Sequence, residues 1–341
     1  MRVAIAGAGV AGLAASWKLS NRGVTVAVFE RSGRLGGRVS TRSHGGAAFD
    51  DGAQFIRPDP GPVHDLLHHH LPSGDLANVA GDVCPFDAAG QVAPGDPSQN
   101  AQPKLVYRGG LAKLCLLFAK ASAAHIQLGW PVAALERATD GWRLRGPKGV
   151  AGPFDAVVLT LPAPAAAEVL AASAFERDLR DALVAAYREV TYRAIISVAF
   201  GVSGDVPRPQ DAYALVNLDR QHAVSWVAFE HCKPGYVPNP EGVIVAQMAD
   251  GWSRPRMALP DGEAARAAWE ALRGLLADGN DPRWAEVTRW PAALPNNALA
   301  PNDARIAESH GLFLAGDATV GPRAHLALES GLLAADRLLA R

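Results

Sequence analysis

The chain has 341 residues, 49% of them hydrophobic, which is enough for one large or two modest domains with a substantial core. A formal net charge of -1 removes the electrostatic case for binding nucleic acid or an anionic membrane. The three cysteines lack CxxC spacing, so we expect a reduced, cytoplasmic protein with neither a disulfide framework nor a thiolate metal site. No apolar run approaches the ~20 residues of a membrane span, and the first predicted strand leaves no room for a signal peptide.

A strand, a turn and a helix are predicted in succession at the start of the chain. The apolar run over 3–6 predicts a buried strand, the alanine-rich run over 13–21 a helix, and 24–30 a second strand. The turn before the helix has three glycines in GxGxxG spacing: Gly7, Gly9 and Gly12.

This succession predicts a dinucleotide site. The first glycine makes the tight turn, the second admits a pyrophosphate to the backbone, and the third lets helix and strand pack closely. The helix N-terminus attracts the phosphates, and Glu30, at the end of the second strand, is placed to bind an adenosine ribose. A purely structural glycine-rich turn is the alternative, but it does not require this context.

A second glycine pair follows the acid. Residues 31–41 read RSGRLGGRVST, with Gly36 and Gly37 before Arg38. A nicotinamide site does not need this pair. It resembles the continuation seen in FAD enzymes of the amine oxidase and glutathione reductase type, where the loop closes over the FAD pyrophosphate. The resemblance implies that Arg38 contacts a phosphate or the flavin side, whereas the alternative is a mobile basic loop.

Residues 45–56 read GGAAFDDGAQFI. In flavin amine oxidases and their relatives a similar segment passes beside the isoalloxazine ring. The resemblance implies that small residues such as Ala53 let the backbone lie against the ring, while Gln54 and Phe55 face the substrate. An ordinary glycine-rich hairpin is the alternative.

The middle of the chain predicts the remainder of an FAD domain. A helix over 62–71 carries three adjacent histidines, which point in three directions and cannot bind one metal ion together, so we predict no metal site. Further predicted elements are a helix over 111–123, short strands over 126–128, 133–137 and 142–145, a buried parallel strand over 154–161, and an alanine-rich helix after it. This block resembles the part of the FAD fold that contains a three-stranded meander.

From about residue 165 longer strands alternate with loops. Strands are predicted over 192–201, 212–218, 224–231, 243–250 and 286–290, with one amphipathic helix over 262–276. Antiparallel strands with helices predict a second domain whose sheet covers the flavin face. The candidate pocket residues there are Arg193, Trp226, Phe229, Arg289 and Trp290.

A strand over 311–317 ends in Gly316 and Asp317, and a helix is predicted over 326–340. Such a strand delivers an acid to the ribityl or pyrophosphate hydroxyls of FAD. The helix points its N-terminal N–H groups toward the flavin N1/C2=O region, where negative charge develops on reduction. Both ends of the chain together predict FAD more specifically than either end alone.

Four segments resemble renalase and renalase-like bacterial flavoproteins, and they are spread over the whole chain: 49–56 (FDDGAQFI), 159–170 (LTLPAPAAAEVL), 289–295 (RWPAALP) and 314–339 (LAGDATVGPRAHLALESGLLAADRLL). The chain departs from this family after Arg323, where relatives usually carry Val-Glu-Gly-Ala and this sequence has Ala-His-Leu-Ala. The resemblance places His325 close to the flavin, where an imidazole in place of an acid changes the electrostatics of the ring or the choice of substrate.

The resemblance implies an α/β fold: a Rossmann-type, p-hydroxybenzoate hydroxylase-like FAD-binding domain, with a second α+β substrate domain built on an antiparallel sheet. The FAD-binding domain is predicted to be discontinuous, over 1–56, 105–164 and 306–341, with 57–104 and 165–305 forming the substrate domain. The predicted contacts to noncovalent FAD are Gly7, Gly9, Val10, Ala11, Gly12, Glu30, Arg31, Gly36, Gly37, Arg38, Ala53, Gln54, Phe55, Val132, Gly316, Asp317 and Leu326. The residues predicted for catalysis at the flavin face or substrate pocket are Gln54, Arg289, Trp290 and His325.

The activity implied by the resemblance is oxidation of dihydronicotinamide isomers (2- and 6-dihydro-NAD(P)) to NAD(P)+, by hydride transfer to flavin N5 and reoxidation by O2 to H2O2. The predicted partners are therefore a small-molecule substrate and O2, and the oligomeric state stays open. One alternative is a flavin amine oxidase or desaturase-like activity on an amine or isoprenoid. Another is a flavin-binding redox sensor without turnover.

Overall fold

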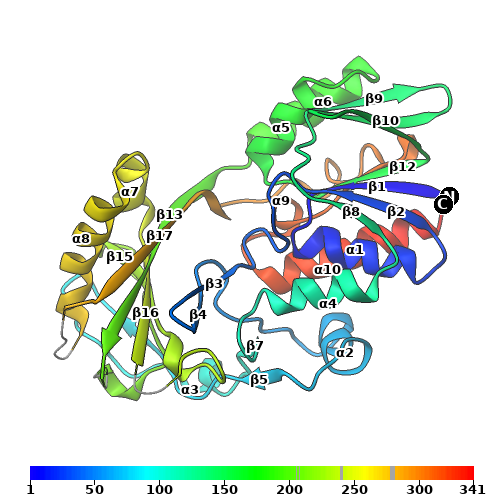
Figure 1. The fold of residues 1–341 in the computed structure, drawn as a ribbon. Coiled ribbons are helices and arrows are strands. Elements are labelled where there is room, and N and C mark those ends of the chain that lie inside the picture. The colour runs from blue at the N-terminus through cyan, green and yellow to red at the C-terminus, as the bar shows by residue number, and fades with distance from the viewer. Residues whose placement is uncertain (205, 207, 239–240, 277–280) are drawn as a thin grey trace.

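Two β-sheets organise the computed structural model, which describes residues 1–341 except 205, 207, 239–240 and 277–280 (Figure 1). One is a five-stranded parallel sheet and the other a six-stranded, mainly antiparallel sheet. This agrees with the predicted α/β class and second antiparallel sheet.

The parallel sheet brings the two ends of the chain together. Its strand order is β18-β12-β1-β2-β8, and every neighbouring pair runs parallel. The strands are β1 (Arg2–Ala6), β2 (Thr25–Phe29), β8 (His125–Gln127), β12 (Ala156–Leu159) and β18 (Leu312–Leu314). Because the strands are parallel, their carboxyl ends meet at one edge of the sheet, which is where α/β proteins bind ligands.

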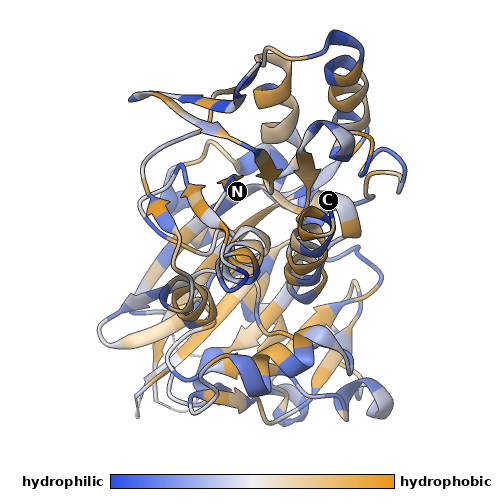
Figure 2. Ribbon diagram, turned by 90° about the vertical axis from the view of Figure 1, so that its right-hand side faces the viewer, coloured by the Kyte–Doolittle hydropathy of each residue, from blue (hydrophilic) through white to orange (hydrophobic). Residues whose placement is uncertain are grey.

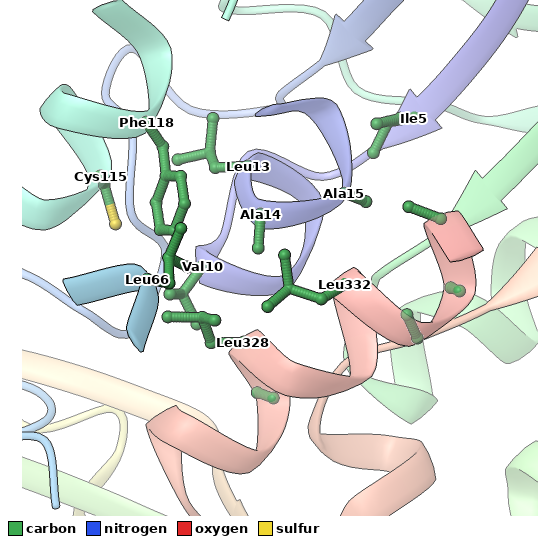
Figure 3. Close-up of a cluster of buried hydrophobic side chains, with 14 of the residues drawn as sticks. Ile5, Val10, Leu13, Ala14, Ala15, Leu66, Cys115, Phe118, Leu328 and Leu332 are labelled. Atoms are coloured by element: carbon green, nitrogen blue, oxygen red, sulfur yellow. The ribbon is translucent and has the colours of Figure 1, made fainter. Parts of the chain in front are cut away.

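Three helices cover one face of this sheet: α1 (Val10–Ser20), α4 (Lys113–Ala121) and α10 (Ala324–Leu339). Their apolar residues form one buried cluster with the sheet (Figure 3). In this cluster Leu13 of α1 lies near Phe118 of α4, and Leu328 and Leu332 of α10 reach α1 from the other side. The last helix of the chain therefore stabilises the first.

The other face carries an antiparallel meander and two helices. The meander consists of β9 (Ala134–Ala138), β10 (Gly141–Gly146) and β11 (Gly149–Phe154), and the helices are α5 (Ala163–Ala171) and α6 (Arg177–Arg188). Strand β11 and helix α6 were not predicted from the sequence. The strand predicted over 126–128 does not belong with the meander, because β8 pairs with β2 in the parallel sheet.

Helices α5 and α6 belong to the core of the first sheet. Leu170 and Leu183 are buried in the same cluster as Trp142 of the meander and Leu159 of β12. The domain boundary predicted at residue 165 stays a prediction, but this packing favours a boundary after α6.

The second sheet has the order β17-β13-β16-β15-β14-β6, with only β14 and β6 running parallel. Its strands are β6 (Val83–Phe86), β13 (Tyr192–Ser203), β14 (Ala214–Asn217), β15 (Val224–Phe229), β16 (Glu241–Met248) and β17 (Trp284–Pro295). Helix α8 (Asp261–Leu272) covers one face, where Trp269 packs against Phe200. The opposite face looks toward the hairpin β3–β4 (Thr41–His44 and Ala47–Asp50) and the parallel sheet (Figure 1).

Shorter elements complete the fold. They are the strands β5 (Leu76–Asn78) and β7 (Leu105–Tyr107); the helices α2 (Pro62–Asp65), α3 (Pro97–Asn100), α7 (Asp250–Ser253) and α9 (Asp317–Val320); the π-helical turn η1 (Leu66–His70); and the 3-10 turns η2 (Pro209–Asp211), η3 (Glu230–Cys232), η4 (Arg254–Arg256), η5 (Arg273–Leu275) and η6 (Glu308–His310). No helix among the described residues is both long and apolar enough to cross a membrane.

Hydrophobic residues are frequent along the strands of both sheets (orange in Figure 2). The two termini lie at one end of the molecule, and Met1 and Arg341 line the same surface hollow. That hollow lies at the amino ends of the parallel strands, beside Asp155 and Ala156. The glycine-rich turn is at the opposite, carboxyl edge.

Candidate flavin site

The GxGxxG turn joins the carboxyl end of β1 to α1 and leaves no room for side chains at its first and third glycines. A Cβ on Gly12 would lie 2.0 Å from the carbonyl oxygen of Gly7, and one on Gly7 would lie 2.7 Å from Thr160 Oγ1. At Gly9, by contrast, no heavy atom of the described residues other than its chain neighbours lies within 4 Å of such a Cβ. The backbone at Gly9 therefore borders open space, as an approaching pyrophosphate requires.

Glu30 lies directly beside this turn. Its Oε2 accepts a hydrogen bond from the backbone N–H of Ala8 (2.9 Å) and its Oε1 accepts one from Ser32 (2.8 Å). The residue is 8% exposed. These bonds hold the carboxylate in position, and each oxygen keeps a lone pair for a ribose hydroxyl.

The second glycine pair packs against the first turn. The N–H of Gly36 donates to the carbonyl oxygen of Ala8 (2.8 Å), and Gly9 and Gly36 form a parallel bridge. A Cβ on Gly37 would lie 3.5 Å from Gly9 Cα. The loop over 31–41 therefore closes on the same open space that borders Gly9.

Arg38 forms a bidentate ion pair with Asp317. Its two terminal nitrogens donate to the two carboxylate oxygens, each at 2.6 Å, and one also donates to the carbonyl oxygens of Ala292 (3.1 Å) and Ala293 (3.2 Å). Burial opposes the charge on Arg38, but the neighbouring carboxylate outweighs it, so the pKa of Arg38 lies above its ordinary value. The sequence predicted each residue at the cofactor but not their pairing.

The carboxyl ends of β1, β12 and β18 are tied together next to this pair. Thr160, after β12, donates from its Oγ1 to the carbonyl oxygen of Ala6 at 2.8 Å. After β18, the N–H of Gly316 donates to Ser330 Oγ of α10 at 2.8 Å. The C-terminal Gly-Asp thus lies at the same edge of the sheet as the N-terminal glycines.

The segment after β4 runs along Arg38. The N–H of Ala53 donates to the carbonyl oxygen of Arg38 (2.9 Å), and a Cβ on Gly52 would lie 2.0 Å from that oxygen. The buried amide of Gln54 donates to the carbonyl oxygen of Asp50 (2.5 Å) and accepts from Lys233 Nζ (3.2 Å). Gln54 therefore points into the protein, whereas the resemblance implied that it faces the substrate.

A fully buried charged cluster, formed by Asp50, Glu230, Lys233 and Tyr236, lies under this segment. Lys233 Nζ is 2.8 Å from Asp50 Oδ2 and 2.7 Å from Glu230 Oε1, with no side-chain exposure in any of the three. Tyr236 donates its hydroxyl to Asp50 Oδ2 at 2.7 Å. Burial raises the pKa of Glu230 to about 7, with Lys233 opposing the shift.

This cluster was not predicted from the sequence. Glu230 and Lys233 are three residues apart, a spacing too common to single out, and Asp50 is 183 residues from Lys233. Only the fold brings them together. Through Asp50 and Gln54 the cluster fixes the backbone of the segment that the resemblance placed beside the flavin ring.

The second sheet presents a row of polar and aromatic side chains to the same segment. Gln247, Ser197 and Thr288 are register partners on three adjacent strands, and Trp226 on β15 is paired with Gln247. Gln247 Nε2 donates to the carbonyl oxygen of Gly52 (2.6 Å), and Thr288 Oγ1 donates to the carboxylate of Asp51 (2.7 Å).

Three buried polar atoms around this row have no hydrogen-bond partner among the described residues: Ser197 Oγ, Trp226 Nε1 and Asp51 Oδ1. Burial raises the pKa of Asp51, although the hydrogen bond from Thr288 opposes the shift. Buried polar groups are normally paired, so unpaired ones grouped in one place indicate a polar ligand. These residues fit a flavin ring, whose edge offers several hydrogen-bonding groups.

Trp290 and Arg289 lie on opposite faces of β17. Trp290 donates its Nε1–H to the carbonyl oxygen of Asp51 at 2.8 Å, so it contacts the segment after β4, residues 51–55, which we call the flavin-side segment. Its role in catalysis stays a prediction. Arg289 instead pairs with Asp261 at 2.5 Å and donates to Leu259. Because successive residues of a strand face opposite ways, Arg289 does not reach the site where it was predicted.

The remaining predicted residues lie around the same edge. His325 and Leu326 are half-buried in the first turn of α10, and burial followed by the charge of Arg323 lowers the pKa of His325. Val10 and Ala11 are buried at the start of α1, and Arg31 is exposed. Val132 is half-buried and lies two residues after Trp130, whose backbone N–H donates to the carbonyl oxygen of Glu30. Within the described part of the chain, no three His, Cys, Asp or Glu side chains are grouped to hold a metal ion.

A Rossmann-type turn, a second glycine pair, and a C-terminal Gly-Asp that converge on one edge define a flavoprotein of the FAD-dependent oxidoreductase class. Residues 95–339 match the family of flavin containing amine oxidoreductases, and residues 5–70 match the NAD(P)-binding Rossmann-like domain. The chain belongs to the flavin containing amine oxidoreductase family. The cofactor that these residues fit is FAD.

Known proteins similar to this chain agree with that assignment. Over 66 residues the chain is 46% identical to protoporphyrinogen oxidase 2, chloroplastic/mitochondrial, of Arabidopsis thaliana, a match covering 19% of this chain and 13% of the plant protein. The crystal structure of “Putative protoporphyrinogen oxidase” from Exiguobacterium sp. 255-15 has a TM-score of 0.82 at 15% identity, covering 100% of this chain and 99% of that one. Wild-type putrescine oxidase bound to putrescine has a TM-score of 0.74 at 15% identity, with 100% of both chains covered. At these identities the two structures show a common fold.

Proposed function

We propose that this protein oxidises a small reduced donor, with dihydronicotinamide isomers (2- and 6-dihydro-NAD(P)) as the donor class, and returns NAD(P)+. When bound, FAD supplies the hydride acceptor at N5 and passes the electrons to O2, which yields H2O2. The family assignment supports the flavin chemistry, and the four renalase-like segments support the donor class. The observation that carries the flavin part of the proposal is the meeting of Gly9, Gly37 and the Arg38–Asp317 pair at one edge of the parallel sheet.

The tasks left to the protein in such a reaction are positioning and exclusion of water. A dihydronicotinamide expels its hydride with help from its own nitrogen lone pair, so no strong acid or base is required. The donor carbon must instead be held ~3–3.5 Å from the acceptor atom. Gly52 and Ala53, fixed by hydrogen bonds to Gln247 and Arg38, provide a rigid backbone for this purpose.

The proposed cofactor and donor are tested by anaerobic mixing. The purified, FAD-loaded protein is mixed with 2- or 6-dihydro-NAD, and the flavin absorbance near about 450 nm is followed. Rapid bleaching with either isomer, followed by H2O2 on admission of air, is the expected result. Bleaching with amines alone would overturn the donor class, and no bleaching with any donor would favour a redox sensor.

An amine donor is the second candidate, and one observation favours it. Phe55, Tyr213 and Trp226 form an aromatic group next to the flavin-side segment, with ring centroids 6.3 Å (Phe55–Tyr213) and 6.1 Å (Phe55–Trp226) apart. Aromatic faces attract ammonium groups as well as flat rings. A panel that includes putrescine, the ligand of the similar solved structure, separates the two donor classes.

A further inference from the structure

Two cations lie side by side at the end of the flavin-side segment. Ile56 and Leu105 form an antiparallel bridge with two backbone hydrogen bonds of 2.8 Å. Arg57 follows Ile56 and Lys104 precedes Leu105. Because the two segments are antiparallel, these two cations lie next to each other. Like charges in such positions are destabilising unless an opposite charge lies between them.

No ion pair to a carboxylate neutralises these cations among the described residues. Arg57 donates to Gln99 Oε1 at 3.2 Å, and its buried Nε has no partner in that part of the chain. Lys104, only 3% exposed, donates its Nζ to the carbonyl oxygen of Asn100 at 3.3 Å. Both side chains thus meet neutral acceptors, although burying a charge is costly without a counter-charge.

Two further basic residues, Arg323 and His325, stand at the start of α10, and their electrostatic interactions include Arg57. Burial, and then the positive charge of Arg323, lowers the pKa of Arg57. The pKa of His325 is lowered by burial and then by the positive charges of Arg323 and Arg57, while the negative charge of Asp59 raises it. The pKa of Lys104 is lowered by burial and then by the positive charge of Arg57, while the negative charge of Asp82 raises it.

The packing of α2 against α10 agrees with this placement, because α2 begins a few residues after Arg57. The two carboxylates whose charges act on this group are Asp59, which opposes the shift at His325, and Asp82, which opposes the shift at Lys104.

The aromatic group adjoins these cations. The guanidinium of Arg57 lies over the ring of Phe55, 5.2 Å from its centroid, and Phe55 in turn contacts Trp226. Phe55 and Trp226 are both half-buried, and Trp226 Nε1 is among the unpartnered polar atoms described above. Phe55 and Trp226 thus form a flat apolar surface that extends from the second sheet to Arg57.

We propose that Arg57, Lys104, Arg323 and His325 form an anion subsite for a phosphate or carboxylate of the electron donor, while Phe55 and Trp226 hold its flat body beside the flavin. This inference rests on the proposed function and narrows it to donors that carry an anionic group. It also disfavours polyamines, which the four basic side chains repel.

The anion subsite is tested directly by calorimetric titration of the FAD-loaded protein with inorganic pyrophosphate, since bound FAD already fills its own phosphate site. The Arg57→Gln variant is expected to bind pyrophosphate about tenfold more weakly, as loss of a charge-assisted hydrogen bond implies. Arg256→Gln is the matched control, because Arg256 also lies over an aromatic ring, that of Trp252 at 4.8 Å. Equal binding by wild type and Arg57→Gln, or no binding by either, overturns the subsite.

The role in donor binding is tested by anaerobic flavin reduction with two donors that share the reacting ring: a dihydro-NAD isomer, and the matching dihydronicotinamide riboside without phosphates. In Arg57→Gln the half-saturating concentration is expected to rise about tenfold for the dinucleotide and to stay unchanged for the riboside. An equal change for both donors overturns the assignment to the donor and leaves a site for free anions. If neither donor reduces the flavin, the proposed function fails, while the pyrophosphate titration still tests the subsite.

Discussion

Arg38 and Asp317 are 279 residues apart in the chain, yet they make two charge-assisted hydrogen bonds of 2.6 Å at the edge where the cofactor residues meet. Such a pair has two effects. It joins the loop after β2 to the segment after β18, and it holds a guanidinium next to the open space at Gly9. Because both side chains are largely buried, each stabilises the charge of the other at the expense of hydration.

Asp317→Asn tests the pair, since it keeps the size of the side chain and removes its charge. We expect the FAD-free protein to lose on the order of 3 kcal/mol of unfolding free energy, because the buried Arg38 loses its counter-charge. Urea unfolding measures the loss. Arg143→Gln is the matched control, since Arg143 and Asp140 form a bidentate pair at the surface, and it is expected to leave stability unchanged. Equal effects of the two variants would contradict the prediction.

Glu230 makes folding stability depend on pH. Its pKa of about 7 in the folded protein lies above its ordinary value of 4.5. Between these values the unfolded chain has released the proton while the folded chain keeps it. The contribution of Glu230 to stability therefore falls as the pH rises from about 4.5 to about 7 and then levels off.

Glu230→Gln, which has no proton to release, is expected to remove that contribution. The drop in unfolding free energy from about pH 5 to about pH 7.5 should shrink by on the order of 2 kcal/mol. Urea unfolding at several pH values measures it, with the exposed Glu263→Gln as control. An unchanged pH slope in Glu230→Gln would show that the folded protein holds this carboxylate ionised.

At the scale of elements, the close approach of α10 to α1 sets the geometry of the site. A Cβ on Gly331 of α10 would lie 2.1 Å from the carbonyl oxygen of Ala11 in α1. The glycine lets the two helices touch through their backbones, which places the first turn of α10 near the phosphate-binding turn. Apolar side chains such as Leu328 and Leu332 then fill the space around this contact (Figure 3).

Gly331→Ala is expected to cost about 1–3 kcal/mol of unfolding free energy, because the helices must move apart. Gly262→Ala serves as control: it is also a helical glycine, in α8, but apart from its chain neighbours and the backbone of its own helix no heavy atom of the described residues lies within 4 Å of the added Cβ. There the gain in helix propensity is up to about 1 kcal/mol. Urea unfolding compares both variants with wild type. A lower free energy of unfolding in both would show that replacing a helical glycine is destabilising in general, and would contradict the role of the contact between α10 and α1.

At the scale of the whole molecule, the cofactor site is shared between distant parts of the chain. The turn after β1, the loop after β2, the segment after β4 and the Gly-Asp after β18 each contribute, and the second sheet closes the site through Gln247 and Trp290. A ligand that contacts all of them binds only the folded state. Such a ligand therefore stabilises the folded arrangement of the two sheets.

FAD is consequently expected to stabilise the protein against heat. At a free FAD concentration of about 100 times its dissociation constant the gain is about 2.7 kcal/mol, which raises Tm by roughly 4 °C for a chain of this size. Differential scanning calorimetry of the FAD-free protein with and without added FAD measures the shift. Asp317→Asn should show a smaller Tm shift at the same FAD concentration. A wild-type Tm that does not change when FAD is added would contradict the assignment of the site.

Much of the fold was predictable from short-range patterns. The strands β1, β2 and β12 and the helices α1, α4 and α10 were expected within a few residues of their bounds, because apolar runs and helical periodicity report burial locally. Helix α6 was missed although Leu179, Leu183 and Tyr187 repeat at helical spacing, since charged residues surround them. Strand β11 was not predicted, because its sequence, GVAGPF, contains two glycines and a proline.

The sequence by itself determined the kind of cofactor, since the backbone conformation at Gly7 and the lack of space at Gly12 depend on a few adjacent residues. Only the tertiary structure decided the pairing of Arg38 with Asp317, the burial of Lys233 between two carboxylates, the inward turn of Gln54 and the outward position of Arg289. Each of these depends on which strands become neighbours and which face of a strand meets the site. Those are properties of the whole packed chain, and residues close in sequence do not encode them.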